Sequence, residues 1–82
     1  MRTHAACDRL REIVAAVLEI DMTEIQADSL FYDDLAADSL EKVEIAVRIE
    51  REFGVPVDAE EGAELSSVSA ALALLRAKGV VS

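Results

Sequence analysis

Tryptophan is absent from this 82-residue chain, and aromatic residues account for only 4% of it. Glycine occurs three times and proline once. This scarcity of aromatic and turn-forming residues argues against a β-sandwich with many short strands. Because 52% of the residues are hydrophobic, a core can still form, and it must be built from Leu, Ile, Val and Ala. The composition favours packed helices in a chain long enough for one small domain.

Cysteine occurs once, as Cys7, so no internal disulfide is possible. We expect Cys7 to be a small core residue on the apolar side of the first helix. The single histidine, His4, would supply with Cys7 too few ligands for a metal site. No hydrophobic run approaches the length of a membrane-spanning segment, so we expect a cytoplasmic protein that does not bind membranes.

Basic residues are also scarce, with 8 Lys and Arg against 17 Asp and Glu, which gives a net charge of −9. Between Glu12 and Glu41 there are nine carboxylates and no Lys or Arg. Such a field repels nucleic-acid backbones and anionic membranes but attracts basic protein partners. We therefore expect protein partners and no nucleic acid. A surface kept acidic only for solubility is the alternative interpretation.

Hydrophobic periodicity and capping residues predict four helices, over residues 4–19, 39–53, 59 to about 62 or 64, and 66 or 67 to 77. The predicted N-caps are Thr3, Asp58 and Ser66 or Ser67, and Gly54 ends the second helix. The expected fold is all-α. It is a small four-helix bundle of three main helices and one short helix, and it forms a single domain over residues 1–82.

The long loop between the first and second helices, residues 20–38, collects Asp, Ser and Thr and has no helical period. Loops of this length are uncommon in small domains unless they are functional or well packed. We expect a short helical turn within it. We also expect it to be held to the core by four apolar side chains: Ile25, Leu30, Phe31 and Leu35.

The helix over residues 39–53 carries two apolar stripes, about 140° apart on a helical wheel. One stripe comprises Ile45, Ala46, Ile49 and Phe53, and the other comprises Leu40, Val43 and Val47. A helix in a bundle needs only one buried stripe. The second stripe, flanked by Glu44 and Glu50, therefore predicts a docking face for a basic, partly apolar groove. The alternative is that the loop or the short helix covers Leu40 and Val43.

Ser39 lies between the acidic loop and the first turn of this helix. With no base to activate it, Ser39 is a poor candidate for a nucleophile, and we assign no catalytic residue in the chain. A phosphodiester on its side chain would lie in the favourable field of a helix N-terminus. Ser39 is therefore a candidate for modification by another enzyme. The alternative is that it is a plain N-cap residue.

Residues 31–44, Phe-Tyr-Asp-Asp-Leu-Ala-Ala-Asp-Ser-Leu-Glu-Lys-Val-Glu, resemble the phosphopantetheine attachment region of acyl carrier proteins. That region has an F-x-x-D-L-G-x-D-S-L core followed by an acidic amphipathic helix. Residues 49–57 are similar to the family's E-x-x-F-G-[VI]-x-[VI] helix exit. The Asp-Ser-Leu tripeptide also occurs at residues 28–30, but without the following helix. The resemblance covers essentially the whole chain.

The resemblance implies a free-standing, non-catalytic acyl carrier protein that acts as a monomer. A phosphopantetheinyl transferase would attach 4'-phosphopantetheine from coenzyme A to Ser39, and the thiol of this arm would hold acyl groups as thioesters. The acyl chain would enter between the helices. Acyl-transferring and condensing enzymes with basic surfaces would dock on the residues that match the family's recognition positions: Asp38, Leu40, Glu41, Val43, Glu44 and Val47.

The chain departs from the family pattern in two respects. Ala36 stands where the family commonly has Gly, and if the backbone φ there is positive, alanine costs about 1 kcal/mol. Lys42, Arg48 and Arg51 replace positions that are often neutral or acidic in fatty-acid carriers. This favours polyketide or other natural-product synthesis over fatty-acid synthesis. Within the helix, Arg48 can pair with a glutamate one turn before it or one turn after it.

Two alternatives to an acyl carrier remain open. A peptidyl or aminoacyl carrier would look similar, although such carriers more often have His or another residue at the position of Asp38. An acidic helical interaction module that is never modified would use the same apolar stripe to bind a basic partner. Labelling of Ser39 by a transferase distinguishes the second alternative from the carriers.

Overall fold

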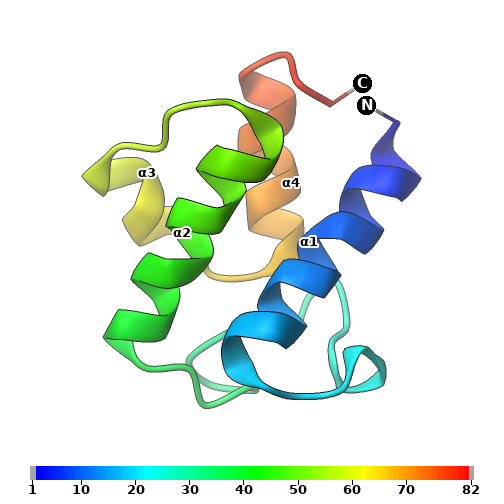
Figure 1. Cartoon of the computed structure of the whole chain (residues 1–82), viewed down its shortest axis with the longest axis vertical. Coiled ribbons are helices and arrows are strands. Elements are labelled where there is room, and N and C mark those ends of the chain that lie inside the picture. The colour runs from blue at the N-terminus through cyan, green and yellow to red at the C-terminus, as the bar shows by residue number, and fades with distance from the viewer. Residues whose placement is uncertain (1, 82) are drawn as a thin grey trace.

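The computed structural model describes residues 2–81, and within them it contains helices and no β-strand. In chain order the elements are α1 (Thr3–Leu18), the 3-10 helix η1 (Met22–Glu24), α2 (Ser39–Phe53), α3 (Ala59–Glu64) and α4 (Val68–Ala77). Helix α1 packs against both α2 and α4, and the short α3 lies beside α2 (Figure 1). The predicted all-α bundle of three main helices and one short helix is confirmed.

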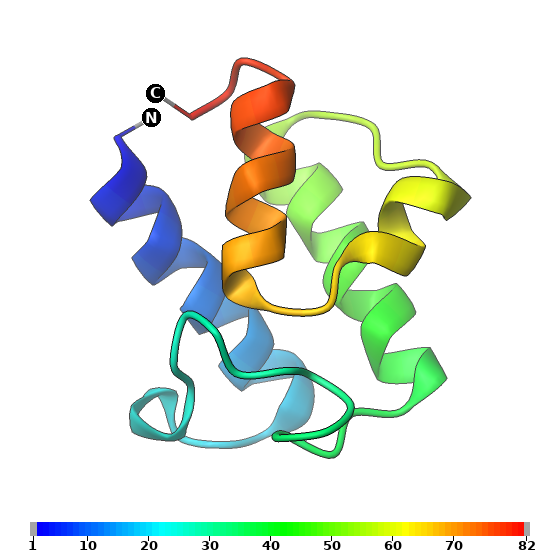
Figure 2. The ribbon, with the colours of Figure 1, turned by 180° about the vertical axis from the view of Figure 1, so that it is seen from behind.

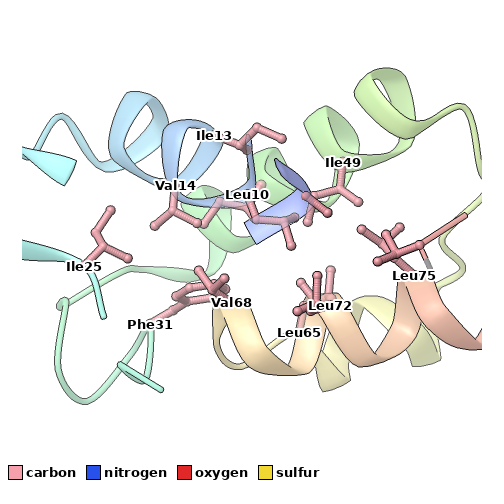
Figure 3. Packing of buried hydrophobic residues seen from close by; sticks show 14 of the residues in the cluster. Leu10, Ile13, Val14, Ile25, Phe31, Ile49, Leu65, Val68, Leu72 and Leu75 are labelled. Carbon is pink, nitrogen blue, oxygen red and sulfur yellow. The ribbon is translucent and has the colours of Figure 1, made fainter. Parts of the chain in front are cut away.

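The core lies between α1, α2 and α4. Figure 3 shows aliphatic side chains from these helices meeting one another, together with Phe31 and Ile25 from the long loop. Four apolar residues of α4 are buried in this core: Val68, Ala71, Leu72 and Leu75. Cys7 is half-buried and packs against this core.

The loop between α1 and α2 crosses one end of the bundle (Figure 2). Phe31 and Ile25 are each only 1% exposed. Full burial of such a side chain stabilises the fold by about 1.5–3 kcal/mol, so these two residues anchor the loop. Polar contacts add to this, because the Arg11 guanidinium donates to the carbonyls of Ile25 and Met22 at 3.1 and 2.8 Å. The expected helical turn is present as η1.

Leu30 does not anchor the loop as predicted, because its side chain is 40% exposed. A tight turn begins at this residue on the surface. Its N–H donates to Asp34 Oδ2 at 2.8 Å, and its carbonyl accepts from the backbone of Asp34 and Leu35. The neighbouring Phe31 occupies the core instead. Leu35 is half-buried against the core, as expected.

Local capping chemistry sets most helix boundaries. Asp58 caps α3, and of the two candidates for α4 it is Ser67 that accepts from the N–H of Ala70, at 3.1 Å. Gly54 ends α2 with a φ of 67°, a left-handed conformation that glycine adopts without strain. None of the helices in residues 2–81 is both long and apolar enough to span a membrane.

The prediction that Thr3 caps α1 is wrong. Thr3 is the first residue of the helix, and Arg2 occupies the cap position without a side-chain hydrogen bond to the helix. The Thr3 hydroxyl instead accepts from the guanidinium of Arg76 in α4, at 3.1 Å. This contact links α1 to α4 across most of the length of the chain.

Candidate functional site

The N-terminus of α2 is closed by a reciprocal pair of hydrogen bonds. Asp38 Oδ1 accepts from the N–H of Glu41 at 2.7 Å, and Glu41 Oε1 accepts from the N–H of Asp38 at 3.0 Å. This arrangement is a capping box, in which each side chain satisfies a backbone donor of the first turn. The N-cap is therefore Asp38, and the interpretation of Ser39 as a plain N-cap is wrong.

Ser39 is the first residue of the helix itself and is exposed. Within residues 2–81 its hydroxyl makes no hydrogen bond, and no imidazole, thiol or carboxylate is paired with it. The hydroxyl is accessible but not activated. It is therefore suited to receive a group from another enzyme, and it lacks the partner base that a nucleophilic serine needs.

The backbone just before the site adopts an unusual conformation. Ala36 has a φ of 57°, in the left-handed region that favours glycine. The next residue, Ala37, is buried, and its N–H donates to the carbonyl of Phe31 at 2.8 Å. The chain thus turns sharply from the core at Ala37 to the surface at Ser39. Alanine was expected to be strained at this position if its φ were positive, and the φ of Ala36 is positive.

The second apolar stripe of α2 is largely uncovered. Leu40 is 81% exposed and Val43 is 60% exposed, so neither the loop nor α3 covers them. Val47 is half-buried. The opposite stripe faces the core as predicted, with Ile45 and Ile49 buried. The part of the chain described here therefore presents an unpartnered aliphatic face directly beside Ser39.

The acidic residues around this face differ in the partners that their carboxylates bind. The carboxylates of Asp38 and Glu41 are held in the capping box, as described above. Glu44 is exposed and pairs with Arg48, whose Nε lies 3.0 Å from Glu44 Oε1. Arg48 does not pair with Glu52, because Glu52 binds Arg9 of α1 at 2.7 Å. The charge of Glu44 is therefore partly neutralised.

A groove of about 510 Å³ runs between α2 and α3 and opens beside Ser39. Its walls are mostly small or aliphatic side chains: Val43, Ala46 and Val47 from α2, and Ala59, Gly62 and Ala63 from α3. Lys42 and Tyr32 also line it. The residues that line this groove were not identified from the sequence. The signal in the sequence was the small residues at Ala59, Gly62 and Ala63, whose spacing puts them on one side of a helix.

Two carboxyl groups in residues 2–81 have a clearly shifted pKa, and neither lines the groove beside Ser39. The pKa of Glu61 in α3 is lowered by the N–H of Asp58 and then by the ammonium of Lys78, 2.9 Å away. The pKa of Asp21 is lowered by the backbone N–H and hydroxyl of Thr23. Among residues 2–81, no three His, Cys, Asp or Glu side chains gather closely enough to hold a metal ion.

The chemistry of the groups around Ser39 fits a covalently attached phosphodiester. The hydroxyl supplies an ester oxygen, the first turn of α2 supplies a positive end of a helix dipole, and Lys42 supplies a nearby cation. The apolar groove beside them suits an acyl chain, because its walls are mostly carbon. The hydroxyl, the helix end and the groove are thus chemically compatible with a covalently attached group.

Comparison with known proteins matches residues 8–75 to a family model described as a phosphopantetheine attachment site. Polyketide-8 synthase acyl carrier protein 2 from Streptomyces avermitilis is 41% identical over 71 residues, which are 87% of this chain and 82% of that protein. An acyl carrier protein from Clostridium acetobutylicum is 44% identical over 61 residues, covering 74% of this chain and 79% of that protein. An acyl carrier protein from Petrotoga mobilis is 39% identical over 71 residues, covering 87% and 84%.

Proposed function

Because this chain belongs to the acyl carrier protein family and carries acyl groups on 4'-phosphopantetheine, we propose that Ser39 is the residue to which that arm is attached. The observation that carries the proposal is the division of roles at the start of α2. Asp38 caps the helix, which leaves the exposed hydroxyl of Ser39 without a structural task. The matched segment, residues 8–75, includes Ser39.

The attachment is a phosphoryl transfer carried out by a phosphopantetheinyl transferase with coenzyme A and magnesium. Ser39 Oγ forms a bond to the phosphorus that bears the pantetheine. The bond from that phosphorus to the bridging oxygen of the pyrophosphate breaks, and adenosine 3',5'-diphosphate leaves. The hydroxyl proton passes to a base of the transferase. The resulting anion lies at the N-terminus of α2, where the helix dipole favours negative charge.

The carrier itself catalyses nothing, and its partners act on the arm. Acyl-transferring and condensing enzymes with basic surfaces dock on the exposed face of α2, through the six residues named from the sequence. The exposure of Leu40 and Val43 supports this assignment, since aliphatic side chains left in water beside carboxylates complement an apolar groove with a basic rim. Asp38 and Glu41 contribute their charge while their oxygens remain in the capping box.

The acyl part of the cargo enters the groove between α2 and α3. The apolar walls and the opening beside Ser39 support this role. We favour polyketide or related natural-product intermediates over fatty acids, because Lys42, Arg48 and Arg51 make α2 less acidic than a fatty-acid carrier's helix. Loading with malonyl-coenzyme A by a malonyl-transferring enzyme, against loading with an amino acid by an adenylating enzyme, separates an acyl carrier from a peptidyl carrier.

The attachment site is tested by intact-protein mass after incubation with coenzyme A and a promiscuous transferase. The wild-type protein should gain one phosphopantetheine group, and Ser39→Ala should gain none. Ser29→Ala is the matched control, because Ser29 lies in the second Asp-Ser-Leu tripeptide but is half-buried, and its Oγ accepts from the N–H of Gln26 at 3.0 Å. This control should be modified like wild type. If Ser39→Ala is still modified, Ser39 is not the site.

A further inference from the structure

Lys42 differs from the other lysine of the chain in its partners. Lys78, the second of the two lysines, pairs with Glu61 at 2.9 Å. The ammonium of Lys42, by contrast, is not within ion-pair distance of any carboxylate in residues 2–81. Lys42 therefore retains most of its capacity to bind an anion.

The position of the Lys42 ammonium is defined by two contacts across the groove. Nζ donates to the carbonyl of Ala63, near the end of α3, at 2.9 Å. It also lies 4.9 Å from the centre of the Tyr32 ring. An ammonium has three N–H donors, and the Ala63 carbonyl takes one of them. The remaining donors are available without breaking the contact to α3.

Lys42 and Ser39 lie on the same side of α2. They are three residues apart, which puts their Cβ atoms about 5–6 Å from each other on the helix surface. Both line the groove between α2 and α3. Helical side chains lean towards the N-terminus, so the Lys42 side chain extends towards the end at which Ser39 lies. The contact with Tyr32, which precedes α2, agrees with this direction.

The dipole of α2 favours a phosphodiester on Ser39, but the acidic residues near it in the sequence oppose it. Asp38 and Glu41 flank Ser39, and the preceding loop adds Asp33 and Asp34. Because like charges repel, these carboxylates oppose a new anion on Ser39. Lys42 is the first cation along the chain after the acidic segment and the nearest in sequence to Ser39. Its ammonium can offset this repulsion.

We propose that Lys42 is a positioning residue for the prosthetic arm, and that its ammonium binds the phosphodiester on Ser39. This inference rests on the proposed attachment at Ser39. The contact holds the first part of the arm at the mouth of the groove between α2 and α3, instead of leaving it free in solvent. Because Lys42 also contacts Ala63, the arm, α2 and α3 are joined through one side chain.

The test uses the modified protein labelled with ¹⁵N only in lysine, so that Lys42 and Lys78 are the two labelled residues. Intact mass first establishes that the arm is present and, with Ser39→Ala, where it is attached. NMR spectra of the unmodified and modified proteins are then compared. The side-chain resonance of Lys42 should move when the arm is attached, and that of Lys78 should stay in place. Equal responses of the two lysines would overturn the proposal.

Variants provide the reciprocal measurement on the arm. The ³¹P resonance of the phosphodiester should shift in Lys42→Met, remain at its wild-type position in the control Lys78→Met, and return towards it in Lys42→Arg, which keeps a cation. An unchanged ³¹P resonance in Lys42→Met would refute the role of Lys42 while leaving the attachment intact. If the mass shows no arm on Ser39, the proposed attachment fails and the role of Lys42 fails with it.

Discussion

Replacing Ala36 with glycine should stabilise the protein, because Ala36 has a φ of 57°. In this left-handed conformation the Cβ of an L-residue approaches the following carbonyl oxygen, which costs about 1–2 kcal/mol. Glycine has no Cβ and avoids this cost. Ala36 is exposed, so removing its methyl group loses no packing. The backbone at this position is fixed by the buried neighbour Ala37 and its hydrogen bond to Phe31.

The expected gain is smaller than the relieved strain. Glycine makes the unfolded chain more flexible, which lowers stability by about 0.4–1 kcal/mol. The difference between the two effects is a net gain of about 0–1.6 kcal/mol in the free energy of unfolding, with a midpoint of ~0.8 kcal/mol. For a domain of this size, each kcal/mol moves the melting temperature by about 4–8 °C. At the midpoint of this range, Ala36→Gly should therefore melt about 3–6 °C above wild type.

Thermal and urea unfolding followed by circular dichroism measure this change. The matched control is Ala73→Gly, at an exposed position within α4. Glycine should lower the free energy of unfolding there by about 1 kcal/mol, because it loses more backbone entropy than alanine when it becomes helical. A second site, Glu19→Gly, tests the same reasoning, since Glu19 ends α1 with a φ of 56°. If Ala36→Gly lowers the melting temperature as the α4 control does, the argument from backbone strain is refuted.

Three further predictions concern the site and the acidic surface. Asp38→Ala should lower the free energy of unfolding by about 1 kcal/mol, because it removes the N-cap of α2. Ser39→Ala should change it by less than about 0.5 kcal/mol in the same urea assay. Equal losses in the two variants would contradict the assignment of the cap to Asp38. Glu61 has a pKa below the ordinary value of 4.5, because it accepts hydrogen bonds from the backbone N–H of Asp58 and from the ammonium of Lys78. A carboxyl group whose pKa is lower in the folded state than in the unfolded state stabilises the fold at pH values above its unfolded pKa. This stabilisation is lost as the pH falls through the folded pKa. Melting temperatures measured from pH 7 down to about pH 3 should therefore fall less steeply in Glu61→Gln than in wild type, and identical slopes would exclude this contribution. Glu44→Lys should slow the transferase reaction several-fold at low salt, whereas Arg48→Ala, which removes the ion-pair partner of Glu44, should speed it. Both differences in rate should shrink as salt is added. Rates that do not change at low salt would argue against the docking face on α2.

The helix boundaries could be predicted where their signals are local. The bounds of α2 match the prediction, and Gly54 ends the helix as predicted, although the residue that caps its start is Asp38 and not Ser39. Ser67 and Asp58 act in the same way on α4 and α3. The start of α1 was predicted with the wrong cap, because Thr3 is bonded to Arg76, a residue 73 positions away. Nothing in the local sequence indicates that contact.

The walls of the groove and the choice of partner in the ion pairs depend on how the helices lie in space, and so local sequence patterns do not determine them. Two glutamates lay within reach of Arg48 along the helix, and only the packing of α1 decides between them, because Arg9 takes Glu52. The role of Lys42 is equally hidden, since its partner is a backbone carbonyl in α3. Every residue has a backbone carbonyl that could accept this hydrogen bond. The packing of α3 against α2 places the carbonyl of Ala63 within reach of Lys42.

The placement of Ser39 one residue inside the helix has an energetic consequence for its proposed modification. An N-cap serine uses its hydroxyl to bond the first turn, and losing that bond costs about 1 kcal/mol. Attaching a phosphodiester to a capping hydroxyl would set this cost against the modification. With Asp38 and Glu41 completing the capping box, the Ser39 hydroxyl can be esterified while both capping hydrogen bonds are retained. The modified and unmodified forms should therefore share the same helix start, and a transferase can act on the folded protein without opening α2.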